Sequence, residues 1–217
     1  NYEKKVLDLT NQLSFIKIVN ASLNLEDMVR AILFSCQGNI LVSGVAIFLP
    51  ETMDREAYSL TSCVGYETER FQIRIRASSH LIKELKKTQD ILRYQDIATK
   101  ERFKRIAAQL DVLQPELLVP LRGKESFTGF LIFGKKLSGR DFTNSELGFI
   151  SSIAEAAAIA IDRAYLYQMA TLDRMSGLYV NHYFKNRLLT EMLRAKRYKQ
   201  HISLIMMDID HFKQVND

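Results

Sequence analysis

The hydrophobic pattern of the chain is dominated by one long helix, which it predicts from about Thr143 to about Leu172. Apolar residues recur along it in alternating steps of three and four, which is the spacing of a coiled-coil seam. These positions are Leu147, Ile150, Ala154, Ala157, Ile161 and Ala164. A second apolar face lies opposite, so the pattern predicts a rod covered on one side by its own domain and on the other by a second helix. A single helix buried within one domain is the alternative.

Capping residues mark where the predicted helices begin and end. Thr143 and Glu146 have the spacing of a capping box, in which each side chain bonds an amide of the other residue. Asn24 caps an earlier helix, whose apolar stripe we expect to end at Gly38. A short helix is expected at His80–Lys87.

Apolar runs between these helices predict strands. They are expected at residues 45–49, 58–64, 71–75, 117–121 and 128–133. The last two flank a turn at Gly123–Lys124 and predict a hairpin. Because the strands follow one another and no regular alternation of strand and helix is seen, we expect an α+β fold, with an antiparallel sheet and flanking helices.

Residues 1–20 carry a short heptad-like pattern. Its apolar positions are Tyr2, Val6, Leu9, Leu13 and Ile16. Together with the long helix, this pattern indicates helices at both ends of the first domain that pair with those of a second chain. Packing of the first helix against its own chain is the alternative.

The composition is that of a globular protein. The chain has 217 residues, of which 47% are hydrophobic and 25% charged, enough for one full core and a second unit. No apolar run reaches the ~18 residues of a membrane span, and no signal peptide is found. Since the chain begins at Asn1 inside a helical pattern, we expect a piece of a longer protein, and an upstream membrane anchor is left open.

The cysteine content indicates the redox state of the compartment, and the charge distribution limits the kinds of partner. Cys36 and Cys63 are too few for a disulfide framework, which fits a reducing cytoplasm. The net charge is +5, and the basic residues cluster on predicted helices without interleaved aromatic residues. We therefore expect solvated helix faces rather than a nucleic-acid interface.

The stretch from Leu131 to Leu147 combines several features. It holds the end of the last predicted strand, a polar loop through Gly139, and the run Phe-Thr-Asn-Ser-Glu-Leu, which enters an Ala-rich helix. In this it resembles a GAF domain, a resemblance that covers residues 21–166 and implies a sensor with an unknown ligand. His80 and Tyr94 lie where GAF domains wall their pocket, and an anion could bind at the helix start beside His80. A surface or packing role for His80 is the alternative.

The last fifty residues carry the candidate chemistry. A helix that Asn181 could cap precedes the apolar run 202–207, which predicts a strand buried on both faces. Asp208 and Asp210 follow directly, and a carboxylate there is unfavourable unless it is solvated, caps a helix or binds a cation. Asp210 is well placed as an N-cap, whereas a hard metal ion explains Asp208 better. Lys213 adds positive charge for a phosphate.

Two runs in this region are distinctive: Asp-Arg-Met-Ser-Gly-Leu-Tyr at 173–179 and Asp-Ile-Asp-His-Phe-Lys-Gln-Val-Asn-Asp at 208–217. Together they resemble the start of a GGDEF domain, the catalytic domain of diguanylate cyclases. The resemblance implies that Leu178 lines the guanine pocket. The family's Gly-Gly-Asp/Glu-Glu-Phe hairpin and second metal-binding carboxylate do not occur among these 217 residues, so we expect the chain to be inactive alone.

The same resemblance assigns roles to single residues of the second run. Asp208, with the carbonyl group of Ile209, would bind Mg²⁺. The backbone amides of Phe212 and Lys213 would contact the phosphates of GTP, and Asn216 would hydrogen-bond the guanine.

The resulting organisation has three parts: an N-terminal signalling helix at 1–20, a GAF sensor domain at 21–166, and a truncated GGDEF start at 167–217 that resembles an α/β cyclase palm. The long helix would couple the last two. The resemblance implies that the parent protein is a homodimer that makes cyclic di-GMP from two GTP. A non-catalytic GAF sensor or scaffold with a degenerate GGDEF domain is the alternative.

Overall fold

The computed structural model describes residues 24–51, 56–66, 72–123, 127–173, 175–211 and 214. The chain divides into two compact units, Asn1–Tyr167 and Gln168–Asp217. The helix predicted for residues 1–20 lies outside the described residues.

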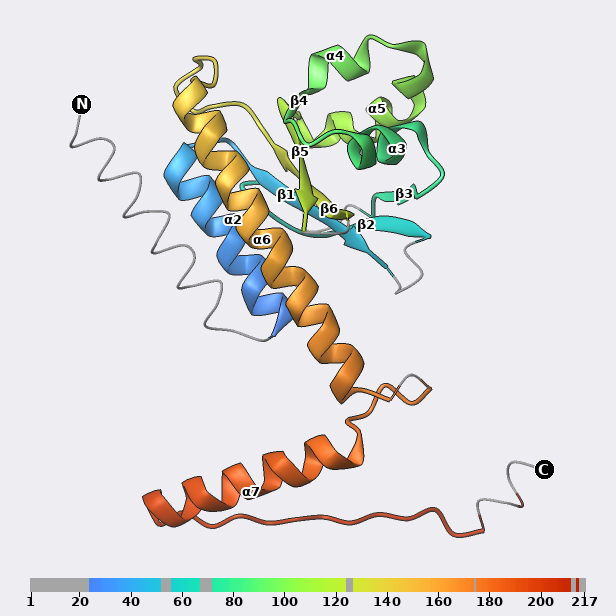
Figure 1. The fold of residues 1–217 in the computed structure, drawn as a ribbon, viewed down its shortest axis with the longest axis vertical. Coiled ribbons are helices and arrows are strands. Elements are labelled where there is room, and N and C mark those ends of the chain that lie inside the picture. The colour runs from blue at the N-terminus through green and yellow to red at the C-terminus, as the bar shows by residue number, and fades with distance from the viewer. Residues whose placement is uncertain are drawn as a thin grey trace. The chain divides into compact units, whose positions relative to one another are not determined.

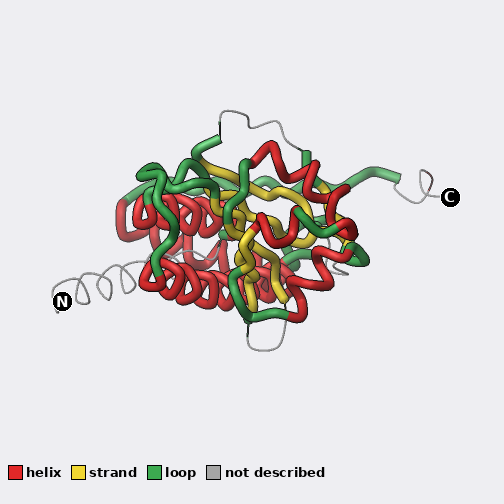
Figure 2. Tube along the Cα trace, turned by 90° about the horizontal axis from the view of Figure 1, so that it is seen from above, coloured by secondary structure: helices red, strands yellow, loops and turns green. Residues whose placement is uncertain are grey.

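A six-stranded antiparallel sheet forms the centre of the first unit (Figures 1 and 2). In spatial order its strands are β3 (Arg74–Arg76), β2 (Ala57–Val64), β1 (Val45–Pro50), β6 (Phe127–Phe133), β5 (Leu117–Arg122) and β4 (Leu92–Arg93). The two central strands are buried along their whole length, and their register pairs Val45 with Phe133. The predicted strands and the β5–β6 hairpin are confirmed, although the strand expected at 71–75 is shorter and runs from Arg74 to Arg76. The two-residue edge strand β4 was not predicted.

Helices pack on both faces of this sheet, as Figure 1 shows. Helices α2 (Leu25–Ile40) and α6 (Asn144–Thr171) cover one face, and α3 (His80–Lys87), α4 (Tyr94–Ala98), α5 (Lys104–Leu110) and the 3₁₀ turns η1 (Glu101–Phe103) and η2 (Asp111–Leu113) cover the other. Successive residues of β1 point alternately to the two sides, because side chains alternate along a strand. Val45, Ile47 and Leu49 join the core under α2 and α6. Ala46 and Phe48 join the core under α3, α4 and α5.

The predicted start of α6 is confirmed in detail. The Thr143 amide donates to Glu146 Oε2 at 2.7 Å, and the Glu146 amide donates to Thr143 Oγ1 at 3.3 Å, which is the capping box. The start of α2 is also confirmed, since Asn24 Oδ1 accepts the amides of the following turn. Its predicted end at Gly38 is wrong. The helix continues to Ile40, and Leu41 ends it in the left-handed conformation (φ 56°).

The predicted coiled-coil seam of α6 is the part of the helix that its own domain buries. Ile150, Ala154, Ala157, Ile161 and Ala164 are 0–3% exposed and belong to the core that α6 shares with α2 and the sheet. The prediction that they pair with a second chain is therefore wrong. A spacing of three and four specifies a helix face that is covered, and it is the same whether the cover is the same chain or another.

The second unit contains helix α7 (Asn181–Tyr198). Val180, and not Asn181, is its N-cap residue and makes no side-chain capping bond. Residues 202–207 are exposed and form no strand, so the prediction of a strand buried on both faces is wrong for this structure. A strand needs a partner for its backbone hydrogen bonds, and the described residues of this unit offer none.

None of the helices in the described part of the chain has both the length and the apolar character that a membrane-spanning segment requires.

Candidate functional site

In the second unit, the turn that precedes α7 is built on Asp173. Its Oδ1 accepts the Ser176 amide at 2.9 Å, the Ser176 hydroxyl at 2.8 Å and the Met175 amide at 3.2 Å. The hydrogen bonds from Ser176, and then that from Met175, hold the pKa of the Asp173 carboxyl below its ordinary value, because they favour the charged form. Asp173 therefore anchors the turn and stays ionised at neutral pH.

The chain closes this turn through its backbone. The Asp173 amide donates to the Leu178 carbonyl at 2.8 Å, and the Val180 amide donates to the Thr171 carbonyl at 2.9 Å. Gly177 lies between them at φ +69°, a conformation that glycine adopts without strain. The Leu178 side chain is 69% exposed, so it presents an apolar surface at the tip of the turn. Its role beside a guanine stays a prediction.

The predicted metal and nucleotide residues follow further along the chain. Asp208, Ile209 and Asp210 are all exposed. Phe212, Lys213 and Asn216 lie outside the described residues. Within the described ranges, no group of three or more His, Cys, Asp or Glu side chains is arranged to hold a metal ion. The chemistry of Asp208 and of the Ile209 carbonyl nonetheless fits Mg²⁺, which prefers oxygen ligands and keeps several waters.

In the first unit, Tyr94 is a core residue. Its hydroxyl lies 2.6 Å from Asp111 Oδ1 and 2.9 Å from the Ala107 carbonyl oxygen, and so joins α4 to α5 and η2. Burial, and then the hydrogen bond and the charge of Asp111, raise the pKa of Tyr94 above its ordinary value. This geometry indicates a structural contact between the helices.

The space between the sheet and α3–α5 is filled by large side chains. Phe48 and Phe130 stack with their ring centroids 4.6 Å apart, and Tyr58 meets Phe127 edge to face at 5.4 Å. His80 is exposed, and it lines a hollow of about 430 Å³ at the outer side of this layer. Tyr94 does not line that hollow. The structure therefore separates the two residues that were predicted to share one pocket.

The same hollow is also lined by Arg74, Arg76, Arg102 and Arg105, none of which the sequence analysis names as a candidate site residue. All four arginines are exposed, as the expectation of solvated basic residues requires. The sequence does carry one signal for part of this set. Arg74 and Arg76 alternate with Ile75, which predicts that both arginines lie on the same side of a strand.

Comparison with known proteins bears on both units. Residues 170–217 match the family model described as diguanylate cyclase, GGDEF domain. Diguanylate cyclase A of Treponema denticola is 32% identical over 221 residues, which cover 99% of this chain and 60% of that protein. Diguanylate cyclase DgcS of Shewanella oneidensis is 40% identical over 48 residues, which cover 22% of this chain and 16% of that protein. This chain thus spans about 60% of the length of the Treponema relative.

Solved structures identify the fold of the first unit. The GAF domain of a phosphoenolpyruvate-protein phosphotransferase from Coxiella burnetii matches with a TM-score of 0.58 at 18% identity, covering 74% of this chain and 95% of that one. The corresponding Acinetobacter domain gives 0.57 at 17% identity, covering 74% and 96%. The chain joins a GAF-fold domain to a segment, residues 170–217, that matches the GGDEF family model. The predicted α+β fold and both predicted resemblances are thereby confirmed.

Proposed function

We propose that this chain is the sensory and regulatory part of a diguanylate cyclase. In this proposal the GAF-fold domain controls a dimeric cyclase that joins two GTP molecules into cyclic di-GMP. The observation that carries it is the similarity to Diguanylate cyclase A, because that similarity runs through both units and covers 99% of the chain. In this proposal the chain works in the cytoplasm, where GTP is available.

The residues of the GGDEF start would prepare one half of the reaction. Asp208 and the carbonyl oxygen of Ile209 would hold Mg²⁺, which supplies positive charge against the phosphates when it is bound. The amides of Phe212 and Lys213, with the Lys213 ammonium, would hold the phosphates of GTP in place. Asn216 would orient the guanine.

Each protomer would present one GTP, so the proposal requires two chains side by side. Since the buried face of α6 is not available, we assign the pairing to its exposed face. Ile159 and Leu166 lie there seven residues apart, one coiled-coil repeat, and are 48% and 66% exposed. Two such helices would bury these side chains against each other.

A chimaera tests this function. Residues 1–172 of this chain replace the matching part of Diguanylate cyclase A from Treponema denticola, and cyclic di-GMP formed from GTP and Mg²⁺ is measured together with the dimer mass. We expect an active dimer. Charging both Ile159 and Leu166 (I159E with L166E) should lower output and dimer together, whereas Ser151→Glu, at an exposed position on the same helix, should not. An active monomer, or an inactive dimer, would contradict the proposal.

A further inference from the structure

A second hollow lies at the edge of the sheet, beside β5. The short strand β4 pairs only with Leu117 and Leu118, so the rest of β5 has no further strand on that side among the described residues. Helix α6 and the loop between α3 and β4 border this open edge, and the hollow between them has a volume of about 260 Å³. Its lining includes Gln89, Ile91, Val119, Arg122, Ala154 and Glu155.

The floor of this hollow is apolar. Val119 and Ala154 are 1% and 3% exposed and belong to the core that α6 shares with the sheet. Ile91 is partly buried and packs against the same core. The floor therefore offers a small surface on which an aliphatic group could lose its contact with water.

Two opposite charges also line this hollow, from different sides of the sheet. Arg122 ends β5 directly after a register shift, and its Nη2 donates to the Lys86 carbonyl oxygen at the end of α3. Glu155 is exposed on α6, which covers the other face of the sheet. Both residues can line one hollow because the two faces of a sheet meet at its open edge.

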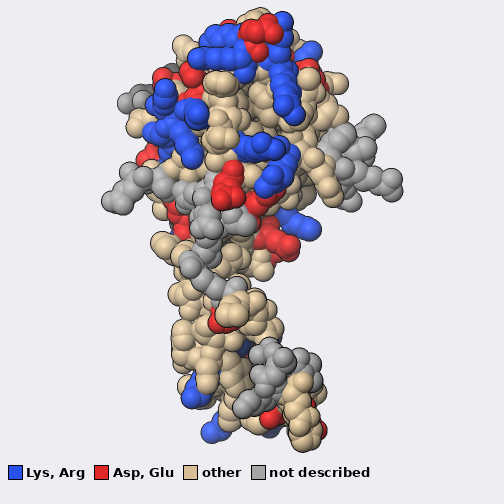
Figure 3. Space-filling model, turned by 90° about the vertical axis from the view of Figure 1, so that its right-hand side faces the viewer, with Lys and Arg blue, Asp and Glu red and all other residues tan. Residues whose placement is uncertain are grey.

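These two charges are not neutralised. On the face of the molecule shown in Figure 3, Lys and Arg side chains lie beside Asp and Glu side chains in several places. Arg122 and Glu155, in contrast, make no ion pair with each other or with any other residue in the described ranges. The Lys86 carbonyl is a neutral partner, and Arg122 Nε is buried without a hydrogen-bond acceptor. A buried donor without an acceptor is unfavourable, so an anionic group beside Arg122 would supply a partner that the chain itself does not.

We propose that this hollow binds a small amino acid with an aliphatic side chain. The ligand's carboxylate pairs with the Arg122 guanidinium, whose planar fork matches two carboxylate oxygens, and its ammonium group pairs with the Glu155 carboxylate. The aliphatic side chain lies on the floor formed by Val119 and Ala154. One positive and one negative residue favour a zwitterion over an anion or a cation. The volume lies just below the usual range of small-molecule sites, about 300–1,000 Å³, which limits the ligand to this size. The proposal does not depend on cyclase activity.

The ligand class is tested by calorimetric titration of this chain with L-alanine, L-valine and L-leucine. The amino acid that binds most tightly is then compared with the amine that lacks its carboxylate and with the acid that lacks its ammonium group. We expect at least one of the three amino acids to bind, and each analogue to bind about tenfold or more weakly, because it loses one charged hydrogen-bonded pair. An analogue that binds as tightly as its amino acid would overturn the proposal, and so would the absence of binding by all three amino acids.

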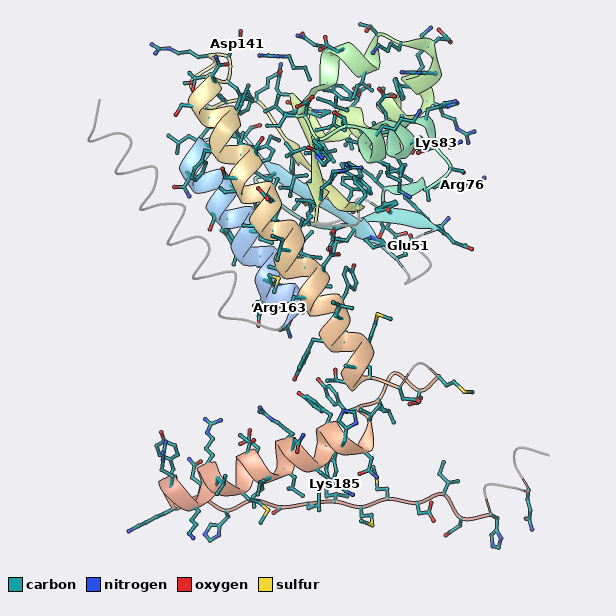
Figure 4. All side chains as sticks on the ribbon, in the orientation of Figure 1. Glu51, Arg76, Lys83, Asp141, Arg163 and Lys185 are labelled. Carbon is teal, nitrogen blue, oxygen red and sulfur yellow. The ribbon has the colours of Figure 1, made fainter. Side chains whose placement is uncertain are left out.

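The site itself is tested by Arg122→Gln and Glu155→Gln, each of which removes one charge from the hollow. Each is expected to weaken binding of the amino acid about tenfold or more. The matched controls are Lys83→Gln and Asp141→Asn, because both residues are exposed in the same domain, do not line this hollow and are labelled in Figure 4. They should change the affinity less than about twofold.

Circular dichroism shows whether each variant is folded. Glu155→Gln changes an exposed side chain that makes no ion pair with a described residue, so it decides alone if Arg122→Gln does not fold. Unchanged affinity in folded Glu155→Gln would contradict the site, and so would equal losses in the hollow variants and their controls.

Discussion

At the scale of single residues, Glu146 ties together three parts of the GAF-fold domain. Its Oε2 accepts the Thr143 amide at 2.7 Å and the Thr143 hydroxyl at 2.9 Å, while Oε1 lies 2.7 Å from Lys136 Nζ. The Lys136 side chain is 9% exposed, and this carboxylate is its ion-pair partner. The capping residue of α6 thereby also secures the loop that follows β6.

Replacing Glu146 by glutamine should lower the stability of the domain at neutral pH but not in acid. Partial burial alone would raise the pKa of Glu146, but the hydrogen bonds from Lys136 and Thr143 outweigh it and hold the pKa below its ordinary value of 4.5. The stabilisation is therefore complete above about pH 4.5 and is lost as the pH falls through the lower folded-state pKa. We expect the free energy of unfolding of the wild type to exceed that of Glu146→Gln by about 1–2 kcal/mol at neutral pH. This difference should vanish in acid, where Glu146 is protonated.

Urea denaturation from neutral pH down to acid measures that difference. Glu155→Gln removes an exposed charge from the same helix and should shift the midpoint little at any pH. A difference between wild type and Glu146→Gln that stays constant into acid would show that the carboxylate charge is not what stabilises this corner.

Two glycines should respond in opposite ways to alanine. A Cβ on Gly129, in the central strand β6, would lie well inside contact distance of the Phe48 carbonyl oxygen and 2.9 Å from Leu49 Cδ2. Because a paired backbone cannot move aside, we expect Gly129→Ala to lower the free energy of unfolding by about 3 kcal/mol. Gly148 in α6 has no atom within 4 Å of that position, so Gly148→Ala should raise it by up to about 1 kcal/mol. Thermal unfolding of both variants measures these changes in stability. If both variants changed the stability equally, the close contact at Gly129 would be contradicted.

At the scale of elements, α6 shows what a hydrophobic pattern can and cannot predict. Its start, its length and its covered face follow from local signals, namely the capping box and the spacing of three and four. The identity of the covering partner depends on tertiary packing, which local spacing does not encode. For the same reason residues 202–207 have the composition of a buried strand but form none, since pairing requires a neighbouring strand.

The candidate sites also differ in how far local sequence can indicate them. The metal and phosphate residues from Asp208 onward could be proposed from the sequence because they are contiguous in it, and they stay a prediction. The hollow beside His80 could not, because the arginines that line it come from β3, η1 and α5, which only the folded sheet brings together. Tyr94 was predicted as a pocket wall from its place in the sequence; the structure shows that its hydroxyl joins neighbouring helices, and its role beside a ligand stays a prediction.

Charge substitutions on α6 distinguish its two faces. Ala157 is 0% exposed, so Ala157→Glu would bury an unpaired carboxylate and should lower the free energy of unfolding by about 3 kcal/mol or more. Ile159 is half-exposed, so Ile159→Glu should leave the fold intact. Circular dichroism during heating separates the two outcomes. If Ala157→Glu melted like wild type and only lost its partner chain, the originally predicted seam would be right after all.

At the scale of the whole molecule, α6 is the element that runs from the GAF-fold domain into the second unit. It is continuous from Asn144 to Thr171, and the boundary between the units falls within it, at Tyr167 and Gln168. A helix transmits rotation stiffly, so any signal that turns or slides α6 would reach the GGDEF start. A usual allosteric coupling of ~1–3 kcal/mol would suffice to choose between two arrangements.

The coupling is tested by changing the rotation that α6 imposes between the two domains. The experiment uses the chimaera with Diguanylate cyclase A described above, because it carries a complete GGDEF domain. Each residue of an α-helix turns the chain by about 100°, so deleting four residues at Gln168 leaves the following domain only about 40° out of phase, whereas deleting two turns it by about 200°. We expect the four-residue deletion to keep most of the cyclic di-GMP output and the two-residue deletion to abolish it, although the latter removes less of the chain. Dimer mass, measured in parallel, should stay the same in both. Equal losses would show that length and not phase matters, and unchanged output in both would show that α6 does not couple the domains.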